Sequence, residues 1–348
     1  MRAAALLFVV GLVHGAITAG TVAALRGRRL QRPDGSTGRR RGALRWIVGL
    51  AGLALVAGLL AVEVGWFYAA AKFEQVERVD VDVDGRSVLA GSPSGTNWLL
   101  VGTDARPEID TSGPGSGGNR ADTMLVLRTG DGPARLMSIP RDLRVALPSR
   151  DGDLGRINSA YNDGPVALIR TVQESVGIPI DRYVEIDFVS FAGLVDALGG
   201  VTIHFDHPAI DTHSGLNVTE SGDVRLDGEQ ALAFVRSRFY QEVIDGEVQP
   251  ADGLADLSRI ERQQTFLRAI LSEAGSSRNP FHLARIADSL TAGLRVDNHM
   301  ELLDALVFAW SMGHLNPERV ELPVQFIQGS GLVDLGPGAD SVIADFSD

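Results

Sequence analysis

The sequence predicts an α/β layered domain that follows a hydrophobic N-terminal region. From about residue 97 onward, strand patterns and helix patterns alternate along the chain. Two apolar runs longer than 20 residues precede this region, and each is long enough to cross a membrane. Three apolar runs of four residues, each bounded by turn residues, are typical of strands buried on both faces. These runs are residues 98–101, 124–127 and 136–139.

Composition and charge limit the classes of function. The 348 residues can form one large domain or two modest ones, and the absence of cysteine excludes disulfides and thiolate metal sites. Residues 1–71 hold nine arginines and two acids, a net charge of +7, whereas the remaining residues carry −19. An acidic main domain argues against nucleic-acid binding, which needs a basic surface.

The two long apolar runs predict two transmembrane helices. Residues 3–25 would form a helix of about 35 Å. Residues 44–68 are similar in length and are interrupted only by Glu63. A cleaved signal peptide is the alternative for the first run. Its basic start is weak, however, and cleavage would leave an arginine-rich segment to be translocated.

The loop between these helices, residues 26–43, is rich in arginine. The positive-inside rule places such a loop in the cytoplasm and everything after residue 71 outside. We therefore expect a multi-pass protein of the cell membrane. It would consist of a membrane hairpin over residues 1–71, a membrane-proximal segment over 72–96 and an extracytoplasmic domain over 97–348.

The elements of the outer domain follow in order. Residues 79–85 alternate valine and aspartate, as in an exposed strand that ends in a turn. A calcium loop is the alternative, but the late glutamate of an EF-hand is missing. Residues 240–253 are polar and rich in acids, which indicates a mobile loop. Helices are expected over 165–176, 188–198, 227–235, 256–274, 281–293 and 299–313, strands over 183–186, 201–205 and 319–322, and a glycine-rich tail after them.

Acidic residues at the strand ends indicate a metal site. Asp104 and Asp122 follow or begin apolar runs, where a strand core would not tolerate charge. Carboxylates on strand ends suit Mg²⁺, which takes one or two of them together with substrate phosphate oxygens. Spacing alone favours the alternative that both are turn or cap residues.

Arginines near the same ends indicate a site for phosphate. Arg120, Arg141, Arg236 and Arg238 could bind an anion through bidentate guanidinium contacts, or they could form surface salt bridges. Arg236 and Arg238 share a side only in extended backbone, so both reach one anion only if the preceding helix has ended by Val235. The sequence contains no P-loop, HExxH or Ser-His-Asp pattern.

Seven stretches, in this order, resemble the LytR-CpsA-Psr family of cell-wall ligases. Each one is weakly specific, but their shared order makes a chance match improbable. They extend over residues 97–270, roughly half the chain. The stretches are NWLLVGTDAR, RADTMLVLR, LMSIPRDLRV, GRINSAY, DRYVEIDFVSFAGLVDALGGV, LDGEQALAFVRSR and RIERQQ.

The resemblance implies a membrane-anchored, three-layer α/β/α domain with a mixed central sheet outside the cytoplasm. It also implies a phosphotransferase that attaches a glycopolymer from a polyprenyl-pyrophosphate carrier to peptidoglycan through a phosphodiester link. The expected partners are this carrier, peptidoglycan and the membrane, without nucleic acid. The alternatives are a polyprenyl-pyrophosphate phosphohydrolase and a membrane-anchored regulatory or binding protein without catalysis.

The resemblance also assigns roles to individual residues. Asp104 and Asp122 would hold Mg²⁺, with Mn²⁺ as an alternative, and either could accept a proton from the attacking hydroxyl. Arg141 would be required for transfer. Asp256 would orient the cluster, and Arg156 stands where the family usually has lysine. The residues expected to bind pyrophosphate are Arg120, Arg141, Arg156, Arg236, Arg238, Asp256 and Gln263.

An apolar groove for the lipid chain is a further expectation. Phe188, Val189, Phe191 and Leu194 are candidates to line it, and ordinary core packing is an equally good reading of each. The chain also departs from the family in residues 240–253, which form a longer link than usual.

Overall fold

The computed structural model describes residues 38–92, 95–103, 121–130, 132–251, 255–276, 285–286, 288–289, 291, 293–312 and 317–347. The chain divides into two compact units between Ala71 and Lys72, and each unit is described by itself.

The first unit contains α2 (Gly38–Phe73), which ends just inside the second unit. Its stretch Val48–Phe73, 26 residues long, is apolar enough to cross a membrane. At 1.5 Å per residue it spans about 39 Å, more than the roughly 30 Å of a bilayer core. The helix expected over 44–68 is therefore confirmed. It begins earlier than expected, so that residues 38–43 of the expected loop are helical.

The membrane prediction is corrected in number. Among the residues that the structure describes, one helix can span a membrane, not two. The other expected helix, residues 3–25, and most of the loop lie outside the described residues. The described residues thus support a single N-terminal membrane anchor.

The second unit is built on a mixed sheet of seven strands in the order β1-β16-β9-β4-β5-β6-β17. The pairs β1–β16, β9–β4 and β6–β17 are parallel and the others antiparallel. The three runs predicted as buried strands form β4, β5 and β6, which are neighbours. The strands are β1 (Glu77–Val79), β4 (Thr96–Thr103), β5 (Ala121–Thr129), β6 (Arg135–Ser138), β9 (Arg182–Asp187), β16 (Leu294–Asp297) and β17 (Glu318–Val320).

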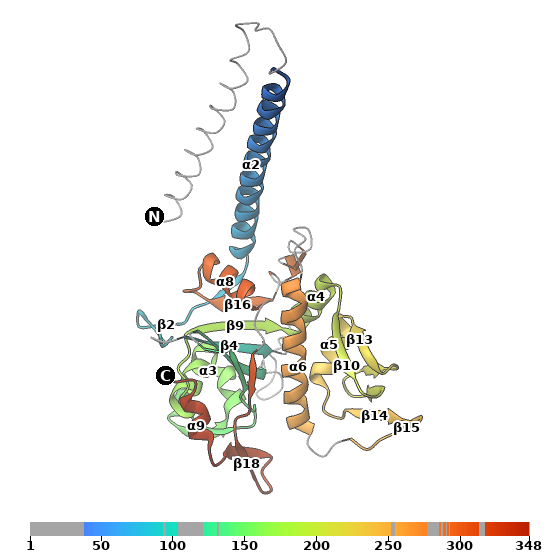
Figure 1. The fold of residues 1–348 in the computed structure, drawn as a ribbon. Coiled ribbons are helices and arrows are strands. Elements are labelled where there is room, and N and C mark those ends of the chain that lie inside the picture. Colours follow the sequence, from blue (N-terminus) through green and yellow to red (C-terminus); the bar gives the residue numbers. More distant parts are fainter. Residues whose placement is uncertain are drawn as a thin grey trace. The chain divides into compact units, whose positions relative to one another are not determined.

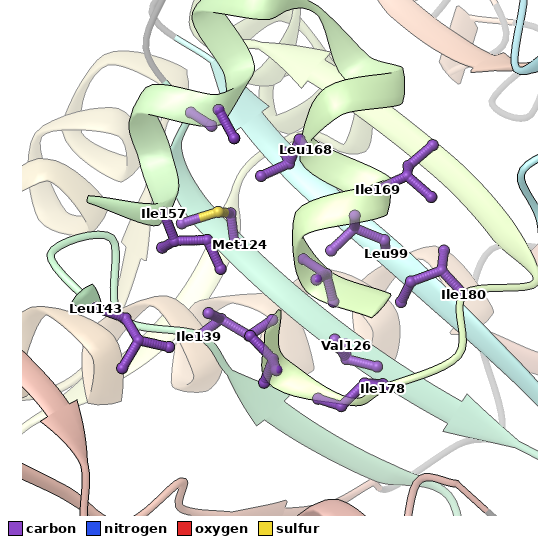
Figure 2. Packing of buried hydrophobic residues seen from close by; sticks show 14 of the residues in the cluster. Leu99, Met124, Val126, Ile139, Leu143, Ile157, Leu168, Ile169, Ile178 and Ile180 are labelled. Atoms are coloured by element: carbon purple, nitrogen blue, oxygen red, sulfur yellow. The ribbon is translucent and has the colours of Figure 1, made fainter. Parts of the chain in front are cut away.

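Both faces of this sheet are covered, because successive strand residues point to opposite sides. Leu99 and Met124 face α3 (Pro165–Thr171), as Figure 2 shows. Trp98 lies on the other face and packs on Phe308 of α8 (Leu302–Met312), with ring centroids 4.0 Å apart. Figure 1 shows α3 and α8 on opposite sides of β4 and β9. The expected three-layer arrangement is therefore present.

A second apolar cluster joins three helices to a hairpin. The helices are α4 (Phe188–Leu198), α5 (Gly228–Arg236) and α6 (Ala255–Ser276), and the hairpin pairs β10 (Val201–Phe205) with β13 (Gly222–Leu226). Phe191 and Leu194 pack against this cluster, and the Phe191 ring lies 4.9 Å from that of Phe266. Ordinary core packing thus describes these two side chains. Those of Phe188 and Val189 lie outside the described residues.

The segment expected to be a mobile loop, 240–253, is instead a hairpin of β14 (Gln241–Ile244) and β15 (Glu247–Val248). Asp245 and Gly246 both have positive φ, 53° and 82°, which is the backbone of a type I′ turn. β14 also pairs with β11 (Ala209–Asp211), so the strand order there is β12-β11-β14-β15, where β12 is Leu216–Val218. Asp-Gly is a strong hairpin signal, but the many acidic residues of this segment favoured the prediction of a loop.

The glycine-rich tail is also ordered structure. It forms the hairpin β18 (Val324–Ile327) and β19 (Leu332–Leu335), followed by α9 (Ala339–Ala344). The carbonyl of buried Phe346 accepts hydrogen bonds from Asn97 Nδ2 at 2.6 Å and Arg128 Nη1 at 3.1 Å. The tail therefore belongs to the core of the second unit.

Smaller differences concern the ends of elements. The expected strand over 79–85 is split between β1 and a two-strand hairpin, β2 (Asp82–Val83) and β3 (Arg86–Ser87). The helix expected over 165–176 changes from α3 to a π-helical turn at Val172–Val176 and stops at Gly177, whose φ is 89°. Most of the helix expected over 281–293 lies outside the described residues.

Candidate functional site

A β-bulge presents Asp122. Gly102 pairs with Thr123 and Thr103 with Ala121, so Asp122 is the extra residue on β5. Bulges re-aim a side chain and often lie beside active sites. The Asp122 side chain is 22% exposed and lines a cavity of about 310 Å³.

Asp122 lies on one wall of this cavity, and a chain of alternating charges extends from it beyond the lining residues. Arg141 donates from Nη1 to Asp122 Oδ1 at 3.0 Å and from Nε to Asp142 Oδ2 at 3.3 Å. Arg156 Nε lies 3.4 Å from the other oxygen of Asp142. The structure thus brings together three of the predicted residues, Asp122, Arg141 and Arg156. Asp142, which the prediction left out, links the two arginines.

The opposite wall comes from the end of α5. This helix ends at Arg236, one residue later than the limit set from the sequence, and Ser237 is extended with ψ of 128°. Arg236 and Arg238 nevertheless both line the cavity, because the chain straightens between them. Gln263 of α6 joins them, and its Nε2 donates to the Val235 carbonyl at 3.4 Å. These three predicted residues therefore share one cavity with Asp122.

Asp211, at the end of β11, also lines the cavity, although no pattern in the sequence pointed to it. It is completely buried. Its Oδ2 accepts hydrogen bonds from Ser237 Oγ at 2.7 Å and from the backbone amides of Arg238 and Phe239 at 3.0 and 2.9 Å. Its Oδ1 accepts from the His213 amide at 2.9 Å. One carboxylate thus holds the backbone of the second wall in place.

The hydrogen bonds also set the charge of this carboxylate. Burial alone would raise the pKa of Asp211, but the bonds from Ser237 and from the backbone amides lower it below its usual value. Asp211 is therefore ionised at neutral pH. Its hydrogen bonds come from backbone amides and a hydroxyl, and the Nδ1 of His213 lies 3.6 Å from its Oδ1.

The β14–β15 hairpin explains why Asp211 meets this segment. Ala209 pairs with Glu242 and Ile210 with Gln241, which aligns β11 antiparallel to β14. The Val243 amide also donates to the Pro208 carbonyl at 2.8 Å. β14 begins two residues after Phe239. This register therefore places Asp211 beside residues 236–238. The long segment 240–253 thus fixes the position of the second wall.

Three predicted site residues remain without a described side chain. Asp104 and Arg120 lie outside the described residues, and Asp256 is described only as part of the α6 backbone. Within the described part of the chain, no three His, Asp or Glu side chains gather closely enough to hold a metal ion. Asp122 is the candidate metal ligand that the structure places in the cavity.

Sequence comparison relates this chain to cell-wall proteins. The profile of the LytR-CpsA-Psr family matches residues 68–329. The chain is 36% identical over 265 residues to the probable cell wall biosynthesis protein LcpB of Corynebacterium glutamicum, covering 71% of this chain and 58% of LcpB. It is 31% identical over 235 residues to TagU of Oceanobacillus iheyensis, a polyisoprenyl-teichoic acid–peptidoglycan teichoic acid transferase, covering 65% and 66%. The chain therefore spans less than two thirds of each relative.

Structure comparison gives the same relationship. A LytR-Csp2A-Psr enzyme from Actinomyces oris superposes with a TM-score of 0.65 at 26% identity, covering 78% of this chain and 96% of that one. TagT of B. subtilis shares the fold with a TM-score of 0.54 at 23% identity, covering 78% and 97%. The family match and these relatives show that the chain belongs to the LytR-CpsA-Psr family.

Proposed function

We propose that this chain is a phosphotransferase that attaches a glycopolymer from a polyprenyl-pyrophosphate carrier to peptidoglycan. The cavity carries this proposal, because separate elements bring Asp122, Arg236, Arg238 and Gln263 to it. Two guanidiniums beside a carboxylate suit an anionic phosphate substrate. The names of the relatives support the same chemistry. TagU is a teichoic acid transferase, and TagT has been solved with bound LIIa-WTA.

The transfer would need little covalent chemistry from the protein. Phosphoryl transfer depends on in-line alignment and on neutralising charge. A sugar hydroxyl of peptidoglycan forms a bond to the phosphorus that carries the glycopolymer. The bond from that phosphorus to the bridging oxygen breaks, and polyprenyl phosphate leaves. The hydroxyl proton passes to Asp104 or Asp122, and the arginines bind the charge that develops on the leaving group.

A divalent cation fits the donors of this site. Asp122, together with Asp104, would hold Mg²⁺ or Mn²⁺. Such an ion, when bound, would neutralise charge that develops on the pyrophosphate. Asp122 lines the same cavity as two arginines, and Mg²⁺ commonly completes its shell with substrate oxygens and water. In the structure Arg141 bonds Asp122 Oδ1, so this guanidinium is placed to move between the carboxylate and an arriving phosphate.

The location follows from α2. We place the protein at the cell membrane, anchored by this helix, with the second unit outside the cytoplasm. The arginine-rich residues that precede Val48 support that orientation through the positive-inside rule. Protease added to intact cells should then degrade the second unit. Its protection would contradict the placement.

A product assay with purified full-length protein tests the reaction. The substrates are a labelled polyprenyl-pyrophosphate-linked sugar polymer and peptidoglycan fragments, with Mg²⁺ present. We expect label on peptidoglycan, and we expect Arg141→Ala to abolish its transfer while thermal unfolding stays close to wild type. The matched control is Arg150→Ala, which removes an arginine paired with Asp163 in a partly exposed salt bridge.

The same assay separates the alternatives. Release of polyprenyl phosphate without any label on peptidoglycan would identify a phosphohydrolase. Binding of the lipid without release of either product would identify a non-catalytic protein. Unchanged transfer in Arg141→Ala would remove this residue from the mechanism.

A further inference from the structure

Two aromatic rings line the cavity beside the arginines. His213 and Phe239 lie with ring centroids 4.4 Å apart and ring planes tilted by 35°. Both residues line the cavity that holds Arg236, Arg238 and Asp122. Phe239 is 48% exposed and the His213 side chain 70% exposed. The pair therefore presents exposed aromatic surface at the cavity that holds the two arginines.

Hydrogen bonds to Asp211 fix the backbone of both residues. The backbone amides of His213 and Phe239 donate to opposite oxygens of buried Asp211, each at 2.9 Å. A second amide, that of Ser214, also donates to Oδ1 at 3.3 Å. Because one carboxylate fixes the backbone of both residues, the rings are preorganised for a ligand.

Core packing does not account for the two rings. Neither residue belongs to any of the three apolar clusters formed by the described residues. An exposed phenylalanine gains little from the hydrophobic effect. Exposed aromatic rings in a cavity commonly serve recognition.

The surroundings indicate which chemistry these rings recognise. The lining also holds two arginines and two aspartates, and one of these aspartates, Asp211, is already bonded to backbone amides and to Ser237. A ligand that carries a phosphate next to an apolar face fits the two arginines and the two rings. A sugar ring attached to phosphate has both, since its C–H groups meet the electron-rich face of an aromatic ring. Its hydroxyls can also bond the imidazole nitrogens, which donate or accept according to tautomer. An isoprenoid chain would instead require enclosed apolar walls.

We propose that His213 and Phe239 form a stacking surface for the sugar ring attached to the reacting phosphate. This inference rests on the proposed function, and it deepens that function by naming residues that select the sugar. The sugar is the first residue of the donor glycopolymer, which is attached to that phosphate before transfer.

Binding of two lipids to the full-length protein in detergent tests the surface. One is polyprenyl pyrophosphate, and the other is the same lipid with a single sugar on its terminal phosphate. We expect Phe239→Ala and His213→Ala each to reduce the preference for the sugar-bearing lipid about tenfold, the scale of one lost stacking contact. Phe239→Leu, which keeps apolar bulk without a π face, should show most of the loss. Phe326→Ala, at an exposed position in β18, is the matched control.

Steady-state transfer provides a second readout. A rise in the KM for peptidoglycan fragments, with unchanged lipid preference, overturns the inference, because the acceptor sugar carries no phosphate before transfer. Unchanged lipid preference together with unchanged KM for both substrates overturns the inference. So does equal weakening of both lipids, which would assign the rings to the lipid or the pyrophosphate.

These outcomes are separate from those that test catalysis. If wild type binds the sugar-bearing lipid more tightly than the variants but transfers nothing, the stacking surface stands and the transferase proposal fails. If wild type transfers label and the variants match it in every parameter, the transferase proposal stands and the surface fails.

Discussion

The two walls of the cavity use their carboxylates differently. On the first wall, Asp122 bonds directly to Arg141, which also bonds Asp142 beyond the lining residues, and all three side chains are partly exposed. On the wall from α5, Asp211 is fully buried and bonds backbone amides and Ser237. The acids of the first wall pair with arginines, whereas the acid of the second wall fixes the position of the backbone.

This difference teaches how each wall can respond to an anion. Ion pairs that reach solvent lose less free energy on separation than fully buried groups do, so they can exchange partners more easily. A buried carboxylate with several donors is different, because removing it leaves those donors unpaired at roughly 1–3 kcal/mol each. The first wall is therefore adaptable, and the second is preorganised.

After the loss of transfer already expected for Arg141→Ala, the largest effect is expected for an arginine of the preorganised wall. Arg236→Ala should lower kcat/KM for transfer roughly 100-fold, the scale of one lost donor to developing charge. Arg236 is exposed at the end of α5, so the free energy of unfolding should change little. Steady-state kinetics and thermal unfolding measure both quantities. Arg236→Lys should recover part of the rate, since it restores the charge without the bidentate fork. An Arg236→Ala enzyme with the wild-type rate would remove this wall from the site.

An intermediate effect is expected for the two carboxylates, and it should differ in kind. Asp211→Asn should lower the free energy of unfolding by about 1–3 kcal/mol, because the buried donors lose a charged acceptor. Asp122→Asn should lower transfer without comparable loss of stability, since its side chain is partly exposed. Chemical denaturation of the two variants compares them directly. Equal losses of stability would break the distinction between the walls.

Acid unfolding sharpens the same contrast. Because the pKa of Asp211 is lowered in the folded state, its contribution is fully present above its unfolded pKa, about 3.9, and is lost as pH falls through the folded value. Asp211→Asn should therefore flatten the decline of wild-type stability below about pH 4. A variant that keeps the wild-type acid slope would show that this charge is not what the donors stabilise.

The smallest effect is expected at the outer end of the adaptable wall. The Arg156 side chain is half exposed and lies 3.4 Å from Asp142. Arg156→Ala should raise the KM for the donor lipid only severalfold, as expected for a partly exposed pair. Arg156→Lys should stay close to wild type, because a point charge suffices there. A loss as large as that of Arg236→Ala would mean that Arg156 contacts the reacting phosphate.

The sequence predicted the parts of the fold that depend on local pattern. The buried strands β4, β5 and β6 were visible as apolar runs, and α4 and β10 have their predicted bounds, 188–198 and 201–205. Asp122, Arg236, Arg238 and Gln263 line one cavity, and the roles that the resemblance assigns to them stay a prediction. Family resemblance supplied those assignments, because spacing alone left the acids and arginines open to ordinary structural roles.

What the sequence did not predict depends on pairing between distant segments. Asp211 and its partner Ser237 are 26 residues apart, and only the β11–β14 register brings them together. The hairpin itself was misread because acidic residues outweighed its Asp-Gly turn. The bulge at Asp122 could not be predicted either, because it is defined by how β5 pairs with β4.

The tail has a consequence for how the protein reaches its folded state. Asn97 at the start of β4 donates to the carbonyl of Phe346, a residue 249 positions further along the chain. The side-chain amide at this position of the central strand is therefore satisfied only when the two segments meet. Loop closure over such a distance is slow, and folding rates fall as contacts become less local. We therefore expect this unit to fold more slowly than a domain of similar size with mainly local contacts.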